Sequence, residues 1–176
     1  RRRELLAGLD IDYRVTALPE VDESYPDTLS GEEIPLYISQ EKAAAYRRFM
    51  KDNTLLITAD TIVWLDGKVY GKPRDIADAK AMLQALSGKT HTVITGVTLT
   101  SLQKQISFTV STEVTFAALG DDEIDYYVEK YRPLDKAGAY GVQEWIGYIG
   151  VTGLKGSYYN VMGLPIQRLY TELKKF

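Results

Sequence analysis

The stretch ITADTIVWLDGKVYGKP, residues 57–73, is the most informative part of the sequence for predicting the central strands of the fold. It places a carboxylate, Asp60, between the apolar runs 54–58 and 62–65. A carboxylate that is buried without a partner is costly, so this residue type is unexpected inside a buried strand. We therefore predict that one strand breaks at residues 59–61 and that a second strand follows the break.

A hairpin is expected directly after the second apolar run. The dipeptide Asp66-Gly67 favours a two-residue turn, because such turns need positive φ angles at their central positions. The chain then returns to Lys72, which can neutralise Asp60 or share a chemical task with it. The ordinary alternatives are that Asp60 only caps a turn and that Lys72 is only a solvated lysine.

Hydrophobic spacing and turn signals predict the remaining elements. Expected helices cover residues 1–8, 35–50, 76–86, 121–131 and 166–175, expected strands cover 11–18, 91–100 and 105–116, and expected loops cover 19–33 and 137–160, the second with short strands. The order of helices and strands is mixed, which is typical of α/β or α+β proteins. We predict the α/β class, with a mixed sheet flanked by helices.

Composition limits the classes of protein that the chain can represent. It has 176 residues, no cysteine and a net charge of −3. The length predicts one domain, and the missing cysteine excludes disulfides and thiolate chemistry and suits the cytoplasm. The net charge gives no support for a nucleic-acid partner, and no apolar run is long enough to cross a membrane.

Several catalytic templates are absent from the sequence. Its single histidine, His91, heads an expected strand and is interpreted as a hydrogen-bonded structural residue rather than a base. The sequence contains no HExxH, GxxxxGK[ST] or GxGxxG pattern. Metalloprotease, P-loop and dinucleotide-binding chemistry therefore lack their usual residues.

Carboxylates and cations remain as the available chemistry. Glu23 and Asp60 offer the oxygen ligands that Mg²⁺ or Mn²⁺ prefers. Cations near turns or helix starts are Arg1, Arg2, Lys42, Lys72 and Lys136. This inventory suits reactions of a polyphosphate, in which cations neutralise oxygens and a carboxylate takes a proton from water. A solvated surface is the alternative for each of these residues taken alone.

Ordered motifs along the whole chain resemble the Maf family of nucleoside triphosphate pyrophosphatases, once named for septum formation. The motifs are RRRELL (1–6), VDES (21–24), QEKA (40–43), ADTIV (59–63), GKP (71–73), LSGKTHTVITGV (86–97), DKAGAYGVQ (135–143) and GSYYNVMGLPI (156–166). RRRELL resembles the end of the family's SxSPRRxELL opening. We therefore expect one Maf-like domain over residues 1–176, with the opening strand and SxSP loop outside these residues.

The resemblance implies a fold and a reaction. The implied fold has two lobes around a central cleft and resembles that of the inosine triphosphate pyrophosphatases, commonly as a homodimer. The implied reaction is hydrolysis between the α and β phosphates of a nucleoside triphosphate, with Mg²⁺ or Mn²⁺, giving a nucleoside monophosphate and pyrophosphate. The break at Asp60 would then turn this carboxylate into the cleft, and the hairpin would bring Lys72 to the same place.

The resemblance also implies roles for individual residues. Asp60 matches the proton acceptor, and Glu23 matches an acidic residue near the metal and the water, so both are expected metal ligands. Lys72 is expected in the catalytic set. Expected substrate-binding residues are Arg1, Arg2, Lys42, Thr61, Lys136 and Gln143.

Base preference is expected from three of these positions. Arg2, Thr61 and Gln143 match positions that distinguish the dTTP/UTP branch of the family, and Gln143 can hydrogen-bond a pyrimidine edge. The family often has glycine after this glutamine, whereas Glu144-Trp145 follows here. The alternatives are a branch directed to 7-methyl-GTP or purines, and a non-catalytic nucleotide-binding regulator of cell division.

Overall fold

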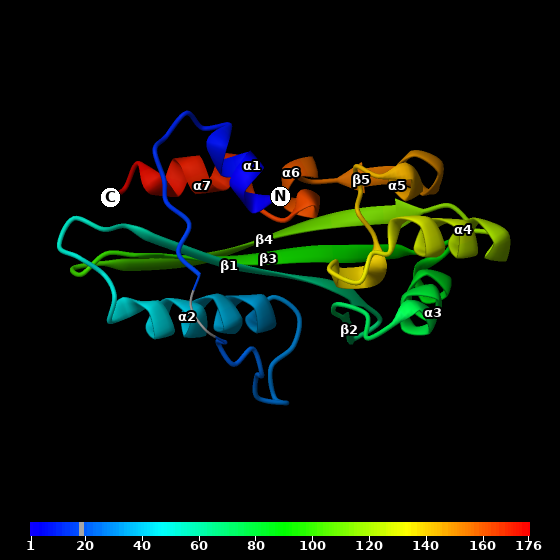
Figure 1. The fold of residues 1–176 in the computed structure, drawn as a ribbon, viewed down its shortest axis with the longest axis horizontal. Helices are drawn as coiled ribbons and strands as arrows, with labels where there is room; N and C mark the ends of the chain where they lie inside the picture. Colours follow the sequence, from blue (N-terminus) through cyan, green and yellow to red (C-terminus); the bar gives the residue numbers. More distant parts are fainter. Residues whose placement is uncertain (18–19) are drawn as a thin grey trace. The chain divides into compact units, whose positions relative to one another are not determined.

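The protein is described here by a computed structural model that covers residues 1–17 and 20–176. Its elements are α1 (Arg2–Ala7), α2 (Glu33–Arg47), β1 (Leu56–Leu65), β2 (Lys68–Tyr70), α3 (Ile76–Leu86), β3 (Thr90–Thr100), β4 (Gln105–Phe116), α4 (Asp121–Tyr131), the 3₁₀ turn η1 (Ala137–Ala139), α5 (Trp145–Gly150), β5 (Val151–Lys155), α6 (Tyr158–Met162) and α7 (Ile166–Leu173). The described strands form one sheet in the order β2-β1-β3-β4-β5 (Figure 1).

The α/β class, with a sheet flanked by helices, is confirmed. The sheet is antiparallel rather than mixed, and short turns connect β1 to β2 and β3 to β4. Leu65 pairs with Lys68 across the β1–β2 hairpin. The turn residues Asp66 and Gly67 have φ angles of 52° and 76°, which confirms the predicted turn.

The predicted break at residues 59–61 is wrong, because β1 is one continuous strand from Leu56 to Leu65. Asp60 lies in the middle of this strand. Its carboxylate has a nearby lysine on α2, and this opposite charge reduces the cost of partial burial. The strand therefore does not need to break at Asp60.

Two further expectations differ from the structure. Residues 11–17 form no strand, and Leu18 and Pro19 lie outside the described residues. All residues from 11 to 17 are exposed, so the alternation has no buried face to stabilise a strand. Residues 137–160, expected as loops with short strands, contain β5 but also the short helices α5 and α6.

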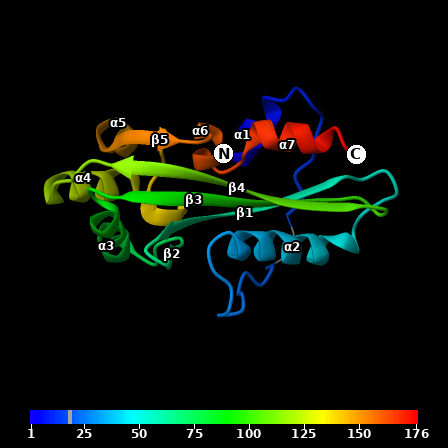
Figure 2. The same ribbon diagram turned by 180° about the vertical axis from the view of Figure 1, so that it is seen from behind.

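The chain divides into two compact units, and the long strands contribute residues to both. Unit 1 comprises Arg1–Thr61, Ile94–Val110 and Gly163–Phe176, and unit 2 comprises Ile62–Val93 and Ser111–Met162. Within unit 1, α2 covers one face of the strands and α7 covers the other (Figure 2). The core of unit 2 includes Leu83, Val114, Phe116, Tyr127 and Ile146.

Among the described residues, no helix has the length and apolar character needed to cross a membrane.

Candidate active site

Asp60 is a partly buried carboxylate within unit 1. It lies on β1, and its side chain is 15% exposed. Burial raises the pKa of the Asp60 carboxyl above its ordinary value, although Lys42 and Arg2 oppose the shift and Glu23 adds to it. A carboxylate with a raised pKa is a stronger proton acceptor than an exposed one, as a general base requires.

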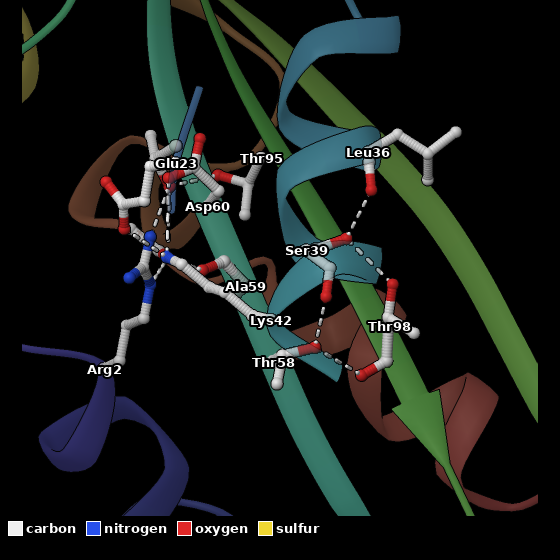
Figure 3. Close-up of polar contacts among 12 residues, drawn as sticks. Arg2, Glu23, Leu36, Ser39, Lys42, Thr58, Ala59, Asp60, Thr95 and Thr98 are labelled. Carbon is white, nitrogen blue, oxygen red and sulfur yellow. Dashed lines mark hydrogen bonds and ion pairs between the residues drawn. The ribbon is translucent and has the colours of Figure 1, made fainter. Parts of the chain in front are cut away.

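Lys42 connects two carboxylates and one carbonyl group (Figure 3). Its Nζ donates to the main-chain oxygen of Ala59 at 3.0 Å. The same Nζ lies 3.1 Å from Glu23 Oε1 and 3.6 Å from Asp60 Oδ1. One ammonium on α2 thus holds a residue of the acidic loop beside a residue of β1, so Lys42, Glu23 and Asp60 lie together.

Arg2 reaches β1 from the first helix. Its Nε donates to the carbonyl oxygen of Gly163 at 2.8 Å, and its Nη2 donates to Thr61 Oγ1 at 3.0 Å. Thr61 Oγ1 also lies 2.8 Å from Thr95 Oγ1. These contacts fix one edge of the guanidinium beside Asp60. Arg1 is exposed and immediately precedes α1.

The oxygen ligands in unit 1 fit a divalent cation of the Mg²⁺ type. Glu23 and Asp60 both approach the Lys42 ammonium, so the two carboxylates are neighbours. No group of three or more His, Cys, Asp or Glu suited to a metal occurs in the described part of the chain. Two carboxylates are nevertheless enough for Mg²⁺, because this ion keeps several waters and takes further oxygens from substrate phosphates.

The remaining expected site residues belong to unit 2. Lys72 follows β2 and is exposed, and Gln143 is exposed at the start of a turn that leads to α5. Lys136 Nζ lies 3.1 Å from Asp135 Oδ1 and 3.7 Å from Glu144 Oε1, so its charge is already compensated. The roles of Lys72, Lys136 and Gln143 stay predictions.

Glu144 takes part in a hydrogen-bond network. The Tyr127 hydroxyl donates to Glu144 Oε1 at 2.6 Å and accepts from the Gly141 amide at 3.0 Å. Through Tyr127, Glu144 therefore links the turn that contains Gln143 to α4. This network could not be predicted from local sequence patterns, because Tyr127 lies on a different helix, α4.

The interpretation of His91 as a structural residue is confirmed. Its Nε2 lies 2.6 Å from the Tyr140 hydroxyl, and its ring is nearly perpendicular to that of Phe116 at 5.1 Å. The side chain is buried, and burial lowers its pKa from 6.5 to about 4.

Sequence reasoning missed the groups that support the charged residues of unit 1. The main-chain oxygens of Ala59 and Gly163 accept from Lys42 and Arg2. The hydroxyls of Ser39, Thr58, Thr95 and Thr98 join the elements that carry these residues. Hydroxyl residues on an otherwise apolar helix face or strand are the one signal that was available. Each of these hydroxyls is paired with a residue far away in the sequence, so the pairs could not be predicted from the sequence.

The whole sequence, residues 1–176, matches the family described as Maf-like protein. The chain therefore belongs to the Maf-like family. It is 67% identical to a protein of Phocaeicola vulgatus over 99% of this chain and 91% of the relative. The identity is 64% with a protein of Bacteroides thetaiotaomicron and 58% with one of Parabacteroides distasonis, over 99% and 100% of this chain and 91% of each relative. All three relatives are named dTTP/UTP pyrophosphatase.

Proposed function

We propose that this protein is a nucleoside triphosphate pyrophosphatase that hydrolyses dTTP and UTP to the nucleoside monophosphate and pyrophosphate. The observation that carries the proposal is the contact of one ammonium, Lys42 Nζ, with both Glu23 and Asp60. The names of relatives at 58–67% identity support the substrate class.

In the proposed reaction, a water molecule attacks a phosphorus atom of the α–β phosphoanhydride. Asp60 accepts the proton of this water, the anhydride P–O bond breaks, and pyrophosphate leaves. The partial burial of Asp60 supports this role, because it makes the carboxylate more basic. Lys42 keeps Asp60 ionised before the reaction by lying 3.6 Å from its Oδ1.

The cations of the chain bind phosphate oxygens in this proposal. Arg2 keeps one guanidinium edge on Gly163 and Thr61, which orients its remaining donors toward a ligand. Arg1 and Lys72 are assigned to phosphate binding by the family resemblance, and Lys136 is assigned to substrate binding. Positioning and charge neutralisation are the main means by which proteins accelerate phosphoryl chemistry.

The proposed cofactor is Mg²⁺ or Mn²⁺, held by Glu23 and Asp60. Such an ion supplies charge neutralisation at the phosphates and lowers the pKa of a bound water. Glu23 and Asp60 would be the protein ligands of the ion. The acid–base step stays with the Asp60 side chain.

Base selection is assigned to Gln143 with Thr61 and Arg2. An amide side chain can pair with the polar edge of a pyrimidine, and a site built on such bonds disfavours bases that leave them unmade. We further propose a cytoplasmic homodimer with a house-cleaning role in the nucleotide pool, without a nucleic-acid or membrane partner.

Pyrophosphate release by the purified protein tests the proposal. The substrates are dTTP, UTP, CTP, GTP, 7-methyl-GTP, ITP and ATP, each with Mg²⁺ or Mn²⁺. Selective release from dTTP and UTP is expected. Preference for 7-methyl-GTP would keep the reaction and overturn the base assignment. Nucleotide binding without any release would support the regulatory alternative.

A further inference from the structure

Hydrogen bonds join the inner face of α2 to the strands beneath it (Figure 3). Gln40 Nε2 donates to Ser107 Oγ at 3.2 Å, and Ser107 Oγ lies 3.0 Å from Thr98 Oγ1. Thr98 Oγ1 lies 2.8 Å from Ser39 Oγ, which donates to the carbonyl oxygen of Leu36 at 2.8 Å. The chain of hydrogen bonds therefore begins and ends on α2 and passes through β4 and β3.

The chemistry of the two ends fixes the direction of every bond in this chain. A carbonyl oxygen only accepts, so Ser39 gives its single hydroxyl proton to Leu36. Thr98 must then donate to Ser39, and Ser107 must donate to Thr98. The Gln40 amide, which only donates through Nε2, completes the series. Each hydroxyl donates once and accepts once, so the bonds polarise one another.

A second contact ties the same helix turn to β1. Thr58 Oγ1 donates to the main-chain oxygen of Ser39 at 2.7 Å. Thr58 and Asp60 are two residues apart on a strand and share one face, and Ser39 and Lys42 are three apart on a helix and share one side. The hydroxyl contact is therefore the immediate neighbour of the contact between Lys42 and Asp60.

The missing side chain of Gly96 allows α2 to pack closely against the sheet. Gly96 on β3 lies directly against the backbone of Pro35 and Leu36, and a Cβ atom at residue 96 would clash with it. The backbone of the first turn of α2 thus lies directly against the backbone of Gly96. Buried hydroxyls, including Ser39 and Thr98 at 0% exposure, then select one register of the helix on this surface.

We infer that Ser39, Thr58 and Thr98 are positioning residues that hold α2 in the register in which Lys42 meets Asp60 and Glu23. They contact neither substrate nor metal and act through Lys42. The inference rests on the proposed function, because it assigns these hydroxyls a part in the same reaction. An error of about 1 Å in such positioning can reduce a rate about 100-fold.

Thr98→Val tests the inference, because it keeps the shape of the side chain and removes the central hydroxyl. We expect kcat/KM for dTTP to fall about 10- to 100-fold. Thr98→Ser keeps the hydroxyl and should restore most of the activity. Thr100→Val is the matched control, since Thr100 is also buried on β3 but accepts from Gln105 and not from α2.

A double-mutant cycle with Lys42→Met separates positioning from stability. If Thr98 acts through Lys42, Thr98→Val should change kcat/KM little once Lys42 is gone. Equal losses in both backgrounds, or equal losses in Thr98→Val and Thr100→Val, would overturn the inference. Wild-type protein that releases no pyrophosphate from any nucleotide would overturn the proposed function, and the inference with it.

Two further measurements cover the case in which Thr98→Val fails to fold. Gln40→Met removes the first donor of the chain at a partly exposed position, and it should lower kcat/KM in the same way to a smaller extent. A crystal structure of this variant should show Lys42 Nζ displaced from Asp60. An unmoved lysine with unchanged kcat/KM would overturn the inference.

Discussion

Lys42 Nζ lies 3.6 Å from Asp60 Oδ1, and this contact joins helix α2 to strand β1 at the centre of the candidate site. Neither side chain is fully exposed, with 18% and 15% of each accessible. The ammonium is shared with Glu23, so it compensates two carboxylates at once. The pair therefore allows a carboxylate to remain ionised in a partly buried position.

Asp60→Asn should abolish most turnover while the protein still folds and binds dTTP. The amide has the shape of the carboxylate but cannot accept a proton, and general-base assistance is typically worth about 10² to 10⁴ in rate. Steady-state pyrophosphate release and calorimetric binding measure the two effects. Asp66→Asn in the hairpin is the control, because asparagine tolerates the φ of 52° found there. Near-normal turnover by Asp60→Asn would remove Asp60 from its role.

Chelation should stop the reaction. Excess EDTA is expected to abolish pyrophosphate release, and added Mg²⁺ or Mn²⁺ should restore it, because phosphate charge needs neutralisation by a hard cation. Glu23→Gln should raise the Mg²⁺ concentration needed for half-maximal activity. Glu20→Gln, in the same loop, should leave that concentration unchanged. A rate that is the same in EDTA would refute the metal requirement.

Gly96→Ala should destabilise the protein by about 1 to 3 kcal/mol or more, since overpacking against rigid backbone forces a shift of structure. The added Cβ would clash with Pro35 on α2. Urea unfolding measures the loss. Gly153→Ala is the control, because its Cβ would meet only Thr115, at 3.8 Å. Equal midpoints for the two variants would show that α2 is free to move away from β3.

Acid should destabilise the fold through His91. Burial lowers its pKa from 6.5 to about 4, so the unfolded chain binds more protons between these values. The stabilisation is therefore complete above pH 6.5 and is lost as the pH falls toward 4, by about 3 kcal/mol in total.

Urea unfolding at several pH values, for wild type and His91→Gln, measures this effect. Glutamine can still hydrogen-bond Tyr140 but does not titrate, so the two stability curves should converge as the pH falls. His91 is the single histidine of the chain, so no other imidazole contributes. Parallel curves would contradict the prediction.

Features that depend on a few consecutive residues were predictable from the sequence. Asp75 caps α3 by accepting from the Asp78 amide at 2.7 Å, and Asp66-Gly67 forms the expected turn. Both follow from the chemistry of side chains next to their own backbone. The strands β3 and β4 and the helix α4 were likewise expected from local patterns.

Features that depend on distant partners were not predictable. The break expected at Asp60 is absent, since a lysine 18 positions earlier in the sequence compensates the charge from α2. The strand expected at residues 11–18 does not form in residues 11–17. Alternation favours a strand only where one face is buried, and residues 11–17 are all exposed.

The sequence by itself determined the α/β class, the family and the identities of the charged residues, because these follow from residue types and their order along the chain. The tertiary structure decided that Asp60 stays inside a strand, that Lys42 compensates both Asp60 and Glu23, and that Ser39, Thr58 and Thr98 fix the helix that carries this lysine. The physical reason is that a buried charge or hydroxyl is satisfied by whichever group packing brings within about 3 Å, and packing joins residues far apart in the sequence.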